Sequence, residues 1–114
     1  MSIRFVEYVN SHKDNRMEFL FVDFDCFDGN DLTAKILHEK CGVIVGEKLD
    51  GFHFSVIPLI DGEYKYNLLW HEDAGNCVYV ENESEESVAR LRELVGIAVA
   101  EINDRIEKAK AKQA

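Results

Sequence analysis

Residues 42–81 read GVIVGEKLDGFHFSVIPLIDGEYKYNLLWHEDAGNCVYVE, and this segment alone predicts most of a β-sheet. Two Asp-Gly pairs, Asp50-Gly51 and Asp61-Gly62, separate runs that are rich in Val, Ile, Phe and Tyr. Asp-Gly supplies the positive φ angles of a type I′ turn, whose twist suits a tight hairpin. The segment therefore predicts an antiparallel meander of four strands, over residues 43–49, 52–60, 64–70 and 77–81.

Side-chain alternation divides the meander into an apolar face and a partly polar face. The apolar face is expected to carry Phe52, Phe54, Val56, Tyr64, Tyr66, Leu68 and Trp70. The polar face, which is either an exposed surface or the lining of a ligand site, is expected to carry His53, Ser55, Lys65, Asn67 and His71. Pro58 has no N–H to donate, so its strand is expected to lie at an edge or to bulge there.

Three further elements are predicted before the meander. Residues 2–9 favour a short helix that Ser2 caps, although their β-branched residues also fit a strand. Residues 17–24 are apolar on both faces, which predicts a strand in a central position of the sheet. A helix is then expected to start at Asn30 or Asp31 and to end before Gly42.

The last element is predicted to be a long helix from about Ser84 to about Lys110, with an apolar stripe that faces the sheet. Asn82 and Glu85 have the spacing of a capping box, and Gly96 is expected to let the helix approach the sheet closely. Together the elements predict an α+β fold in one domain over residues 1–114. It has a largely antiparallel sheet of about five strands, the long C-terminal helix packed on one face, and one or two shorter helices.

Acidic residues outnumber basic residues by 22 to 13, which gives a formal net charge of −9. This balance disfavours a nucleic-acid binder, which needs a basic face, and it suits a partner that is itself basic. No segment has the pattern of a signal peptide or the apolar length of a membrane span, so no membrane contact is expected. The odd count of three cysteines fits reduced thiols, and a cytoplasmic protein is expected.

The cysteines and histidines offer only a weak zinc motif. His38 and Cys41 have ligand spacing, but Cys26 and Cys77 lie far from them in the sequence and no Cys-x-x-Cys pair is present. Free cysteine is often buried as a small apolar side chain. No zinc, no other cofactor and no cysteine nucleophile is therefore predicted.

The Asp-rich turn Asp23-Phe-Asp25-Cys-Phe-Asp28-Gly-Asn-Asp31 offers an alternative of a different class. Its carboxylates could hold Mg²⁺ or Ca²⁺, although the spacing is not that of an EF-hand. Residues 19–25 also resemble the opening motif of haloacid-dehalogenase-type phosphatases, which would make Asp23 the nucleophile and Asp25 the general acid. Phe27 stands where that family usually has Thr or Val, and the chain is shorter than the usual core of that family. A solvated turn with a helix cap accounts for the same residues, so no catalytic residue and no metal ligand is predicted.

Acidic residues are concentrated in two stretches without Lys or Arg, residues 17–31 and 71–86. Residues 1–86 hold 18 acidic and 7 basic residues, whereas residues 87–114 hold 4 and 6. If both stretches meet at one end of the sheet, they form a negative surface that steers a basic partner. The residues predicted to bind that partner are Asp23, Asp25, Asp28, Glu72, Asp73 and Glu81, with Trp70 or Tyr79 as an aromatic anchor.

The whole chain resembles small bacterial immunity proteins of the contact-dependent growth inhibition or polymorphic-toxin type. The resemblance is one of size, acidic charge and α+β layout over the full length, without a diagnostic motif. It implies a protein that binds a cognate toxin domain, commonly a basic nuclease, and blocks its active site. The other alternative is a homo-oligomeric accessory protein, such as a homodimer paired through the final helix or through an edge strand near Pro58.

Overall fold

The computed structural model describes residues 2–113, and within this range an antiparallel sheet of seven strands carries two α-helices. The elements are β1 (Arg4–Asn10), a 3-10 turn (Ser11–Lys13), β2 (Arg16–Val22), α1 (Gly29–Cys41), β3 (Ile44–Val45), β4 (Leu49–Asp50), β5 (Phe54–Asp61), β6 (Tyr64–His71), β7 (Gly75–Val80) and α2 (Glu85–Gln113). The predicted α+β class is confirmed, with more strands than expected.

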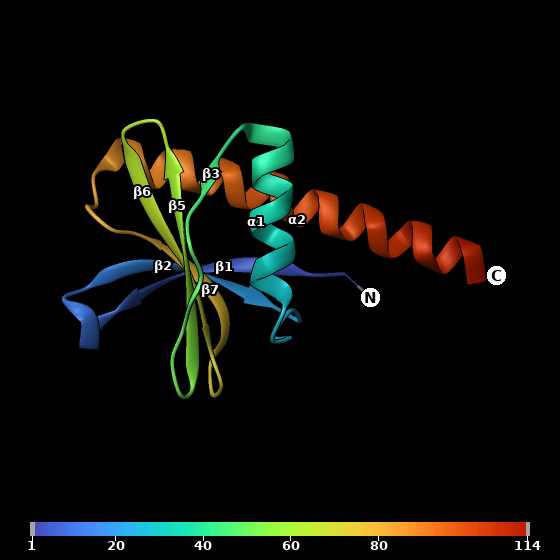
Figure 1. The fold of residues 1–114 in the computed structure, drawn as a ribbon, viewed down its shortest axis with the longest axis horizontal. Coiled ribbons are helices and arrows are strands. Elements are labelled where there is room, and N and C mark those ends of the chain that lie inside the picture. The colour runs from blue at the N-terminus through green and yellow to red at the C-terminus, as the bar shows by residue number, and fades with distance from the viewer. Residues whose placement is uncertain (1, 114) are drawn as a thin grey trace.

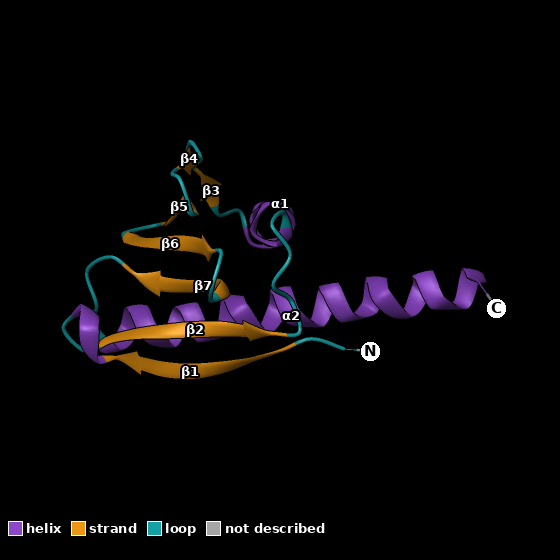
Figure 2. Cartoon of the chain, turned by 90° about the horizontal axis from the view of Figure 1, so that it is seen from below, coloured by secondary structure: helices purple, strands orange, loops and turns teal. Residues whose placement is uncertain are grey.

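The described strands pair in the order β1-β2-β7-β6-β5-β3, and β4 also pairs with β5. Hairpins join most neighbours, whereas β2 and β7 come together from distant parts of the chain. β2 therefore lies inside the sheet, between β1 and β7, as the sequence predicts. The sheet is strongly twisted (Figure 1), and both helices lie on one side of it (Figure 2).

The core lies between the sheet and the two helices. Phe19, Val78, Leu68 and Ile57 stand in one row across four strands, and none is more than 3 % exposed. The helices contribute Ala34, Ile36 and Leu37 from α1, and Leu91, Leu94, Val95, Ala98 and Ile102 from α2. Removal of this apolar surface from water is what holds both helices on the same face. The predicted packing of the last helix on one face of the sheet is confirmed.

The first element is a strand, and the predicted helix over residues 2–9 is wrong. Residues 4–10 pair with β2 along their whole length. Phe5 packs on Phe19 with ring centroids 5.9 Å apart, so the strand places this aromatic side chain against the core. β2 pairs with β7 on one side, and β1 satisfies the backbone N–H and C=O groups on its other side. A helix over residues 2–9 would leave those groups without partners.

Helix α1 ends where the sequence predicts. Gly42 has a left-handed conformation with φ 70°, and its N–H donates to the carbonyl oxygen of His38 at 3.1 Å. Glycine has no Cβ to oppose this conformation, so the helix ends there without strain.

The start of α2 differs from the predicted capping box. Ser87 N–H donates to Ser84 Oγ at 3.2 Å, and Ser84 N–H donates to Ser87 Oγ at 2.8 Å. The reciprocal cap is therefore formed by Ser84 and Ser87, and the predicted pair of Asn82 and Glu85 is wrong. The predicted role of Gly96 is also wrong, because a Cβ at this position would meet nothing within 4 Å.

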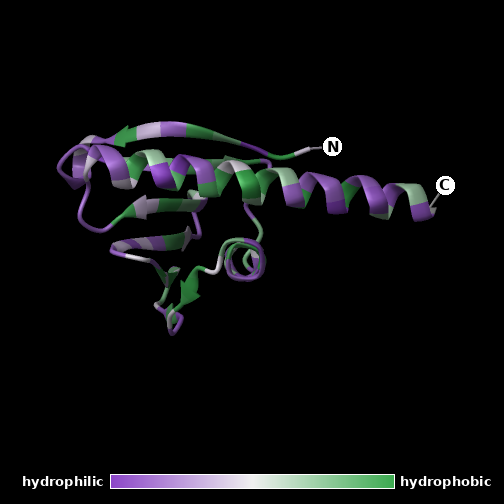
Figure 3. Ribbon diagram, turned by 90° about the horizontal axis from the view of Figure 1, so that it is seen from above, coloured by the Kyte–Doolittle hydropathy of each residue, from purple (hydrophilic) through white to green (hydrophobic). Residues whose placement is uncertain are grey.

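The C-terminal part of α2 extends past the sheet, and the ribbon there is coloured mostly hydrophilic (Figure 3). Its salt bridges run along the helix, from Lys108 to Asp104 at 2.9 Å, and across to α1, from Lys40 to Glu101 at 3.0 Å. Within residues 2–113, no helix combines the length and the apolar character needed to cross a membrane.

The first Asp-Gly pair closes a longer loop than the predicted type I′ turn. Asp50 pairs with Ser55, and Gly51 N–H donates to the carbonyl oxygen of Phe54 at 2.7 Å. Phe52 lies in this loop outside any strand and is 91 % exposed. The strand predicted over residues 52–60 therefore begins at Phe54, two residues later than predicted.

Strand β5 buries the face opposite to the one predicted. Ser55, Ile57 and Leu59 face the helices, whereas Phe54 and Val56 lie on the outer face. Both faces of this strand carry apolar residues, so alternation alone does not decide which face is inside. Strand β6 is buried on the predicted face.

The second Asp-Gly pair forms a two-residue loop of Gly62 and Glu63. Only Gly62 has a positive φ, 61°, which is the pattern of a type II′ turn and not of the predicted type I′. The predicted edge position of the Pro58 strand is wrong, because β5 pairs with β6 on one side and with β3 and β4 on the other. Pro58 faces the break between the short strands β3 and β4, where Gly46 N–H donates to its carbonyl oxygen at 2.8 Å.

Candidate functional site

The loop after β2, residues 23–28, is fastened to the ends of β6 and β7. Asn76 is buried near the start of β7 and donates from Nδ2 to the carbonyl oxygens of Phe24 at 2.8 Å and Cys26 at 3.0 Å. Trp70, near the end of β6, donates from Nε1 to the carbonyl oxygen of Asp25 at 3.2 Å. These side chains satisfy main-chain groups of the loop and fix its path.

Backbone conformation brings the same loop close to β7. Gly75 has φ 78°, and a Cβ at this position would lie 2.9 Å from the Cβ of Asp25. Asp23 also has a positive φ, 63°, which Asp adopts more readily than most residues. Glycine at position 75 is therefore required both by the left-handed turn and by the approach of the Asp25 side chain.

Two further loops lie at the same end of the sheet (Figure 1). Glu72 N–H, in the loop between β6 and β7, donates to the carbonyl oxygen of His53 at 2.9 Å in the loop between β4 and β5. His53 Nδ1 also pairs with a carboxylate oxygen of Glu72. We call this surface the acidic end and define it by its exposed carboxylates, Asp23, Asp25, Asp28, Glu72 and Asp73.

The carboxylates of the acidic end are largely uncompensated. Among residues 2–113, Glu72 alone of the five takes part in an ion pair, with His53. The nearby Lys48 is occupied, since its Nζ lies 3.0 Å from Asp31 and 4.9 Å from the centre of the Phe27 ring. Clustered charges of one sign project a field into the solvent that decays over about 8 Å at physiological ionic strength.

Exposed aromatic rings accompany these carboxylates. Phe27 is 57 % exposed and contacts Trp70 edge-on, with ring centroids 5.0 Å apart. Phe52 is exposed in the loop between β4 and β5, beside His53. Neither Phe27 nor Phe52 is in the predicted site, because Phe52 is predicted within a strand and Phe27 within a solvated turn. An aromatic residue next to an Asp-Gly pair is the sequence signal that finds both, since Phe27 precedes Asp28-Gly29 and Phe52 follows Asp50-Gly51.

The acidic end unites six of the eight residues predicted to bind a partner, namely its five carboxylates and the half-buried Trp70. The other two lie elsewhere. Glu81 follows β7 at the opposite end of the sheet, where its N–H donates to the carbonyl oxygen of Lys65 at 2.9 Å. Tyr79 lies on the outer face of the sheet, with the Arg16 guanidinium 3.5 Å from its ring centre. The second acidic stretch of the sequence is therefore divided between the two ends.

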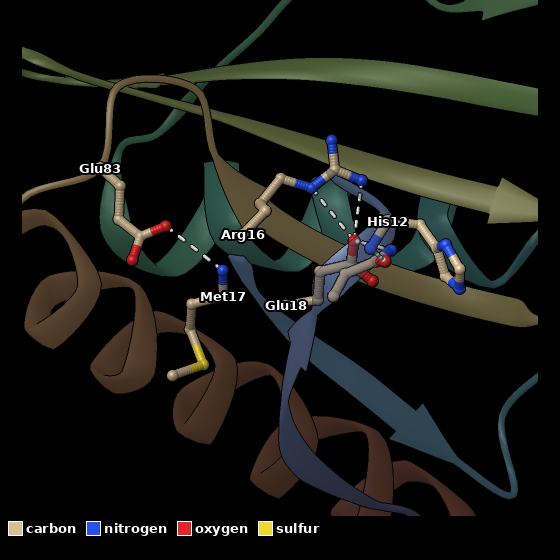
Figure 4. Close-up of polar contacts among 6 residues, drawn as sticks. His12, Arg16, Met17, Glu18 and Glu83 are labelled. Atoms are coloured by element: carbon tan, nitrogen blue, oxygen red, sulfur yellow. Dashed lines mark hydrogen bonds and ion pairs between the residues drawn. The ribbon is translucent and has the colours of Figure 1, made fainter. Parts of the chain in front are cut away.

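Two carboxylates near that opposite end, Glu83 and Glu18, are bonded within the chain (Figure 4). Glu83 accepts a hydrogen bond from Met17 N–H at 3.2 Å. Glu18 is only 5 % exposed, and its Oε2 accepts from Arg16 Nε at 3.0 Å, from Arg16 Nη2 at 2.7 Å and from Asn10 Nδ2 at 3.0 Å. A partner would have to displace these bonds, whereas at the acidic end Glu72 alone of the five described carboxylates is held in an ion pair.

The geometry does not support the alternatives of metal or nucleophilic chemistry. Within the described part of the chain, no three His, Cys, Asp or Glu side chains are grouped so that they could hold a metal ion. His38 Nδ1 lies 3.0 Å from the carbonyl oxygen of Val43 and is used in the structure. Partial burial, and then the Asp28 carboxylate, raise the pKa of the Cys26 thiol, which keeps it protonated at neutral pH.

A groove of about 490 Å³ lies between α1 and β3, not on the polar strand face that the sequence offers as a ligand lining. Its floor is apolar, with Ile44, Val45 and Ile57, and its rim carries Lys35 and the pair of Lys48 and Asp31. None of the five carboxylates of the acidic end lines it. The groove and the acidic end are therefore separate surfaces.

Comparisons with protein-family models, with curated proteins and with solved structures found no match for this chain. The chemistry of its own surface is therefore the basis on which a function can be proposed.

Proposed function

We propose that this protein binds and neutralises a basic protein partner through the acidic end, as an immunity protein that blocks a cognate toxin domain of the nuclease kind. One observation carries the proposal. Trp70 and Asn76 hold the loop of residues 23–28 against β6 and β7, so carboxylates from two distant stretches of sequence stand together beside exposed aromatic rings.

This combination suits a protein interface in which charge guides the encounter and aromatic rings hold the complex. Unpaired carboxylates at a rim raise the rate of association with a basic surface and select against acidic partners. Exposed aromatic side chains such as Phe52 and Phe27 are enriched among the few residues that supply most of the binding energy. A rigid support matters too, because a loop that is already ordered loses less entropy on binding.

The choice of a nuclease follows from the charge of its substrate. A nuclease groove is lined by basic side chains that bind phosphates, and a cluster of carboxylates can occupy the same groove. The mechanism is steric and electrostatic occlusion, which needs no catalytic group on this chain. The resemblance in size, charge and layout to immunity proteins supports the same reading.

The test is a pull-down from lysate of the source organism at low salt, with three versions of the domain as bait. The first is the native chain. The second is the double variant Glu72→Lys/Asp73→Lys, at the acidic end. The third is Glu63→Lys/Glu81→Lys, which changes the net charge equally with exposed residues at the opposite end.

We expect the native bait and the control bait to recover the same basic protein, and the acidic-end variant to lose it. Added salt should release the captured protein, because the screening length shortens as ionic strength rises. Thermal melts of the three baits separate lost binding from lost folding. Equal recovery with all three baits, or no basic protein on the native bait, contradicts the proposal.

A further inference from the structure

The outer face of the sheet, on the side away from both helices, carries a continuous apolar row. The registers of the strand pairs place one residue from each of six strands side by side. In order across the sheet these residues are Val6, Leu20, Cys77, Leu69, Val56 and Leu49. We call this set the apolar row. Its two ends are open to solvent, with Val6 41 % and Leu49 61 % exposed.

The rows on either side mix apolar and aromatic side chains with polar ones, among them Asn67 and His71. Tyr8, Tyr79 and Pro58 stand on one side of the apolar row, and Phe54 stands on the other. Tyr8 and Phe54 are 43 % and 42 % exposed. An antiparallel sheet with helices on one face normally turns a polar face to water. The largest exposed apolar patch of a protein is often a site of contact with another protein.

Charge on this face contrasts with the rest of the molecule. Of the strand carboxylates, Glu7 and Asp61 point toward α2, where they pair with Arg92 and Arg90. Glu18 is the carboxylate on the outer face, and Arg16 and Asn10 enclose it. The bases Arg4, Arg16 and Lys65 share this face. A chain with a net charge of −9 thus keeps one broad face almost free of unpaired carboxylates.

We propose that two copies of this chain pack against each other through their outer faces, with the apolar rows crossing at a two-fold axis. A second copy fits this face because it brings the same apolar surface and the same low density of carboxylates. The basic partner of the acidic end does not fit, since it would meet Arg4 and Lys65. Contact elsewhere between two copies would oppose like charges.

The dimensions of the face are sufficient for such a dimer. The outer face has a fourth row, which holds Arg16 and Lys65 beyond the row of Tyr8 and Pro58. Six strands about 4.8 Å apart and four rows of side chains about 6.8 Å apart cover about 500 Å² in each copy. Two copies then bury about 1,000 Å², which is the lower limit for a specific interface. Sheets that pack face to face lie about 10 Å apart and cross at a small or a near-right angle, and a strongly twisted sheet accepts either.

The test is the mass of the native chain in solution, measured by light scattering from low micromolar to near-millimolar concentration. We expect the mass to rise from 13.1 kDa to twice that value. Salt should strengthen this association, since it screens the repulsion between two chains of net charge −9 while the contact itself is apolar. Salt has the opposite effect on a partner bound through the acidic end.

Two variants of the apolar row, Leu69→Lys and Leu49→Lys, should remain at the monomer mass. Leu49 is exposed enough for the change to leave the fold intact, and Ile97→Lys on the outer side of α2 is the matched control that should still dimerise. The variant Glu72→Lys/Asp73→Lys should also dimerise, which separates this proposal from the proposed function. A native chain that stays monomeric throughout, or folded Leu69→Lys and Leu49→Lys variants that still dimerise, overturns the proposal.

Discussion

Trp70 donates its indole N–H to the main-chain carbonyl oxygen of Asp25, which lies 45 residues earlier in the chain. This bond joins the end of β6 to the loop after β2. Asn76 makes two further bonds to the same loop from the start of β7. The carboxylates of the acidic end are thus held together through the main chain, and of their five side chains only that of Glu72 takes part in an ion pair among the described residues.

Asn76→Ala tests how much of the fold depends on this attachment. The change leaves the carbonyl oxygens of Phe24 and Cys26 without their donor, so we expect the free energy of unfolding to fall by about 2 kcal/mol. Denaturant unfolding measures the loss. Asn67→Ala is the control, because Asn67 lies half-buried on the outer face and should change stability by less than about 0.5 kcal/mol. Equal losses in the two variants would show that the loop is not held by Asn76.

Gly75→Ala tests the close approach of the loop to β7. Gly75 and Gly62 both have positive φ angles, so alanine at either position should cost about 1 kcal/mol in backbone strain. At Gly75 the new methyl group also meets the Cβ of Asp25 at 2.9 Å, whereas at Gly62 it meets nothing within 4 Å. We therefore expect Gly75→Ala to lower the unfolding free energy by about 1–2 kcal/mol more than Gly62→Ala. Thermal melts compare the two, and similar midpoints would argue against the close contact.

Local signals in the sequence predict much of this fold, because the chemistry of each is local. Gly42 ends α1 through its own φ angle, and the stripe on α2 follows from helical periodicity. The strand of residues 4–10 is missed because its partner, β2, is what makes a strand better than a helix. The inner face of β5 is missed for a similar reason, since the registers that place Ile57 beside Leu68 are set by other strands.

The candidate site shows the same division. The sequence identifies the two acidic stretches, but strand direction decides which of their members meet. β7 begins beside the loop of residues 23–28 and ends at the opposite end of the sheet, so Glu72 joins Asp25 while Glu81 does not. The exposure of Phe52 follows from a hairpin longer than Asp-Gly alone predicts.

The start of α2 gives a prediction that separates two caps. Ser84→Ala removes the Oγ that accepts from Ser87 N–H, so we expect a loss of about 1 kcal/mol in the unfolding free energy. Asn82→Ala changes the residue that the sequence favours as the cap, and we expect an effect within about 0.5 kcal/mol. Urea titrations give the unfolding free energy of both variants and so decide between the two caps. A larger loss of unfolding free energy in Asn82→Ala than in Ser84→Ala would show instead that Asn82 and Glu85 form the cap.

Alkaline pH should destabilise the chain through a thiol on the outer face. Burial raises the pKa of Cys77 from 9.0 to about 12, and the nearby Glu18 carboxylate adds to the shift. Between these values the unfolded chain has lost the Cys77 proton and the folded chain has kept it. The unfolded state binds fewer protons there, so stability falls as pH rises, by up to about 1.4 kcal/mol per pH unit. Below pH 9 both states keep the proton and this contribution to the pH dependence disappears.

Cys77→Ala should therefore flatten the fall in stability between pH 9 and pH 12, as measured by urea unfolding at a series of pH values. Cys41→Ala is the matched control and should leave the slope in place, because Cys77 remains. Burial also raises the pKa of Tyr66, so a shallower slope should persist in Cys77→Ala at the upper end of the range. If Cys77→Ala and Cys41→Ala have the same pH profile, the Cys77 thiol is not the group that couples folding to alkaline pH. In that case Tyr66, which is fully buried among core residues, remains the source of the slope.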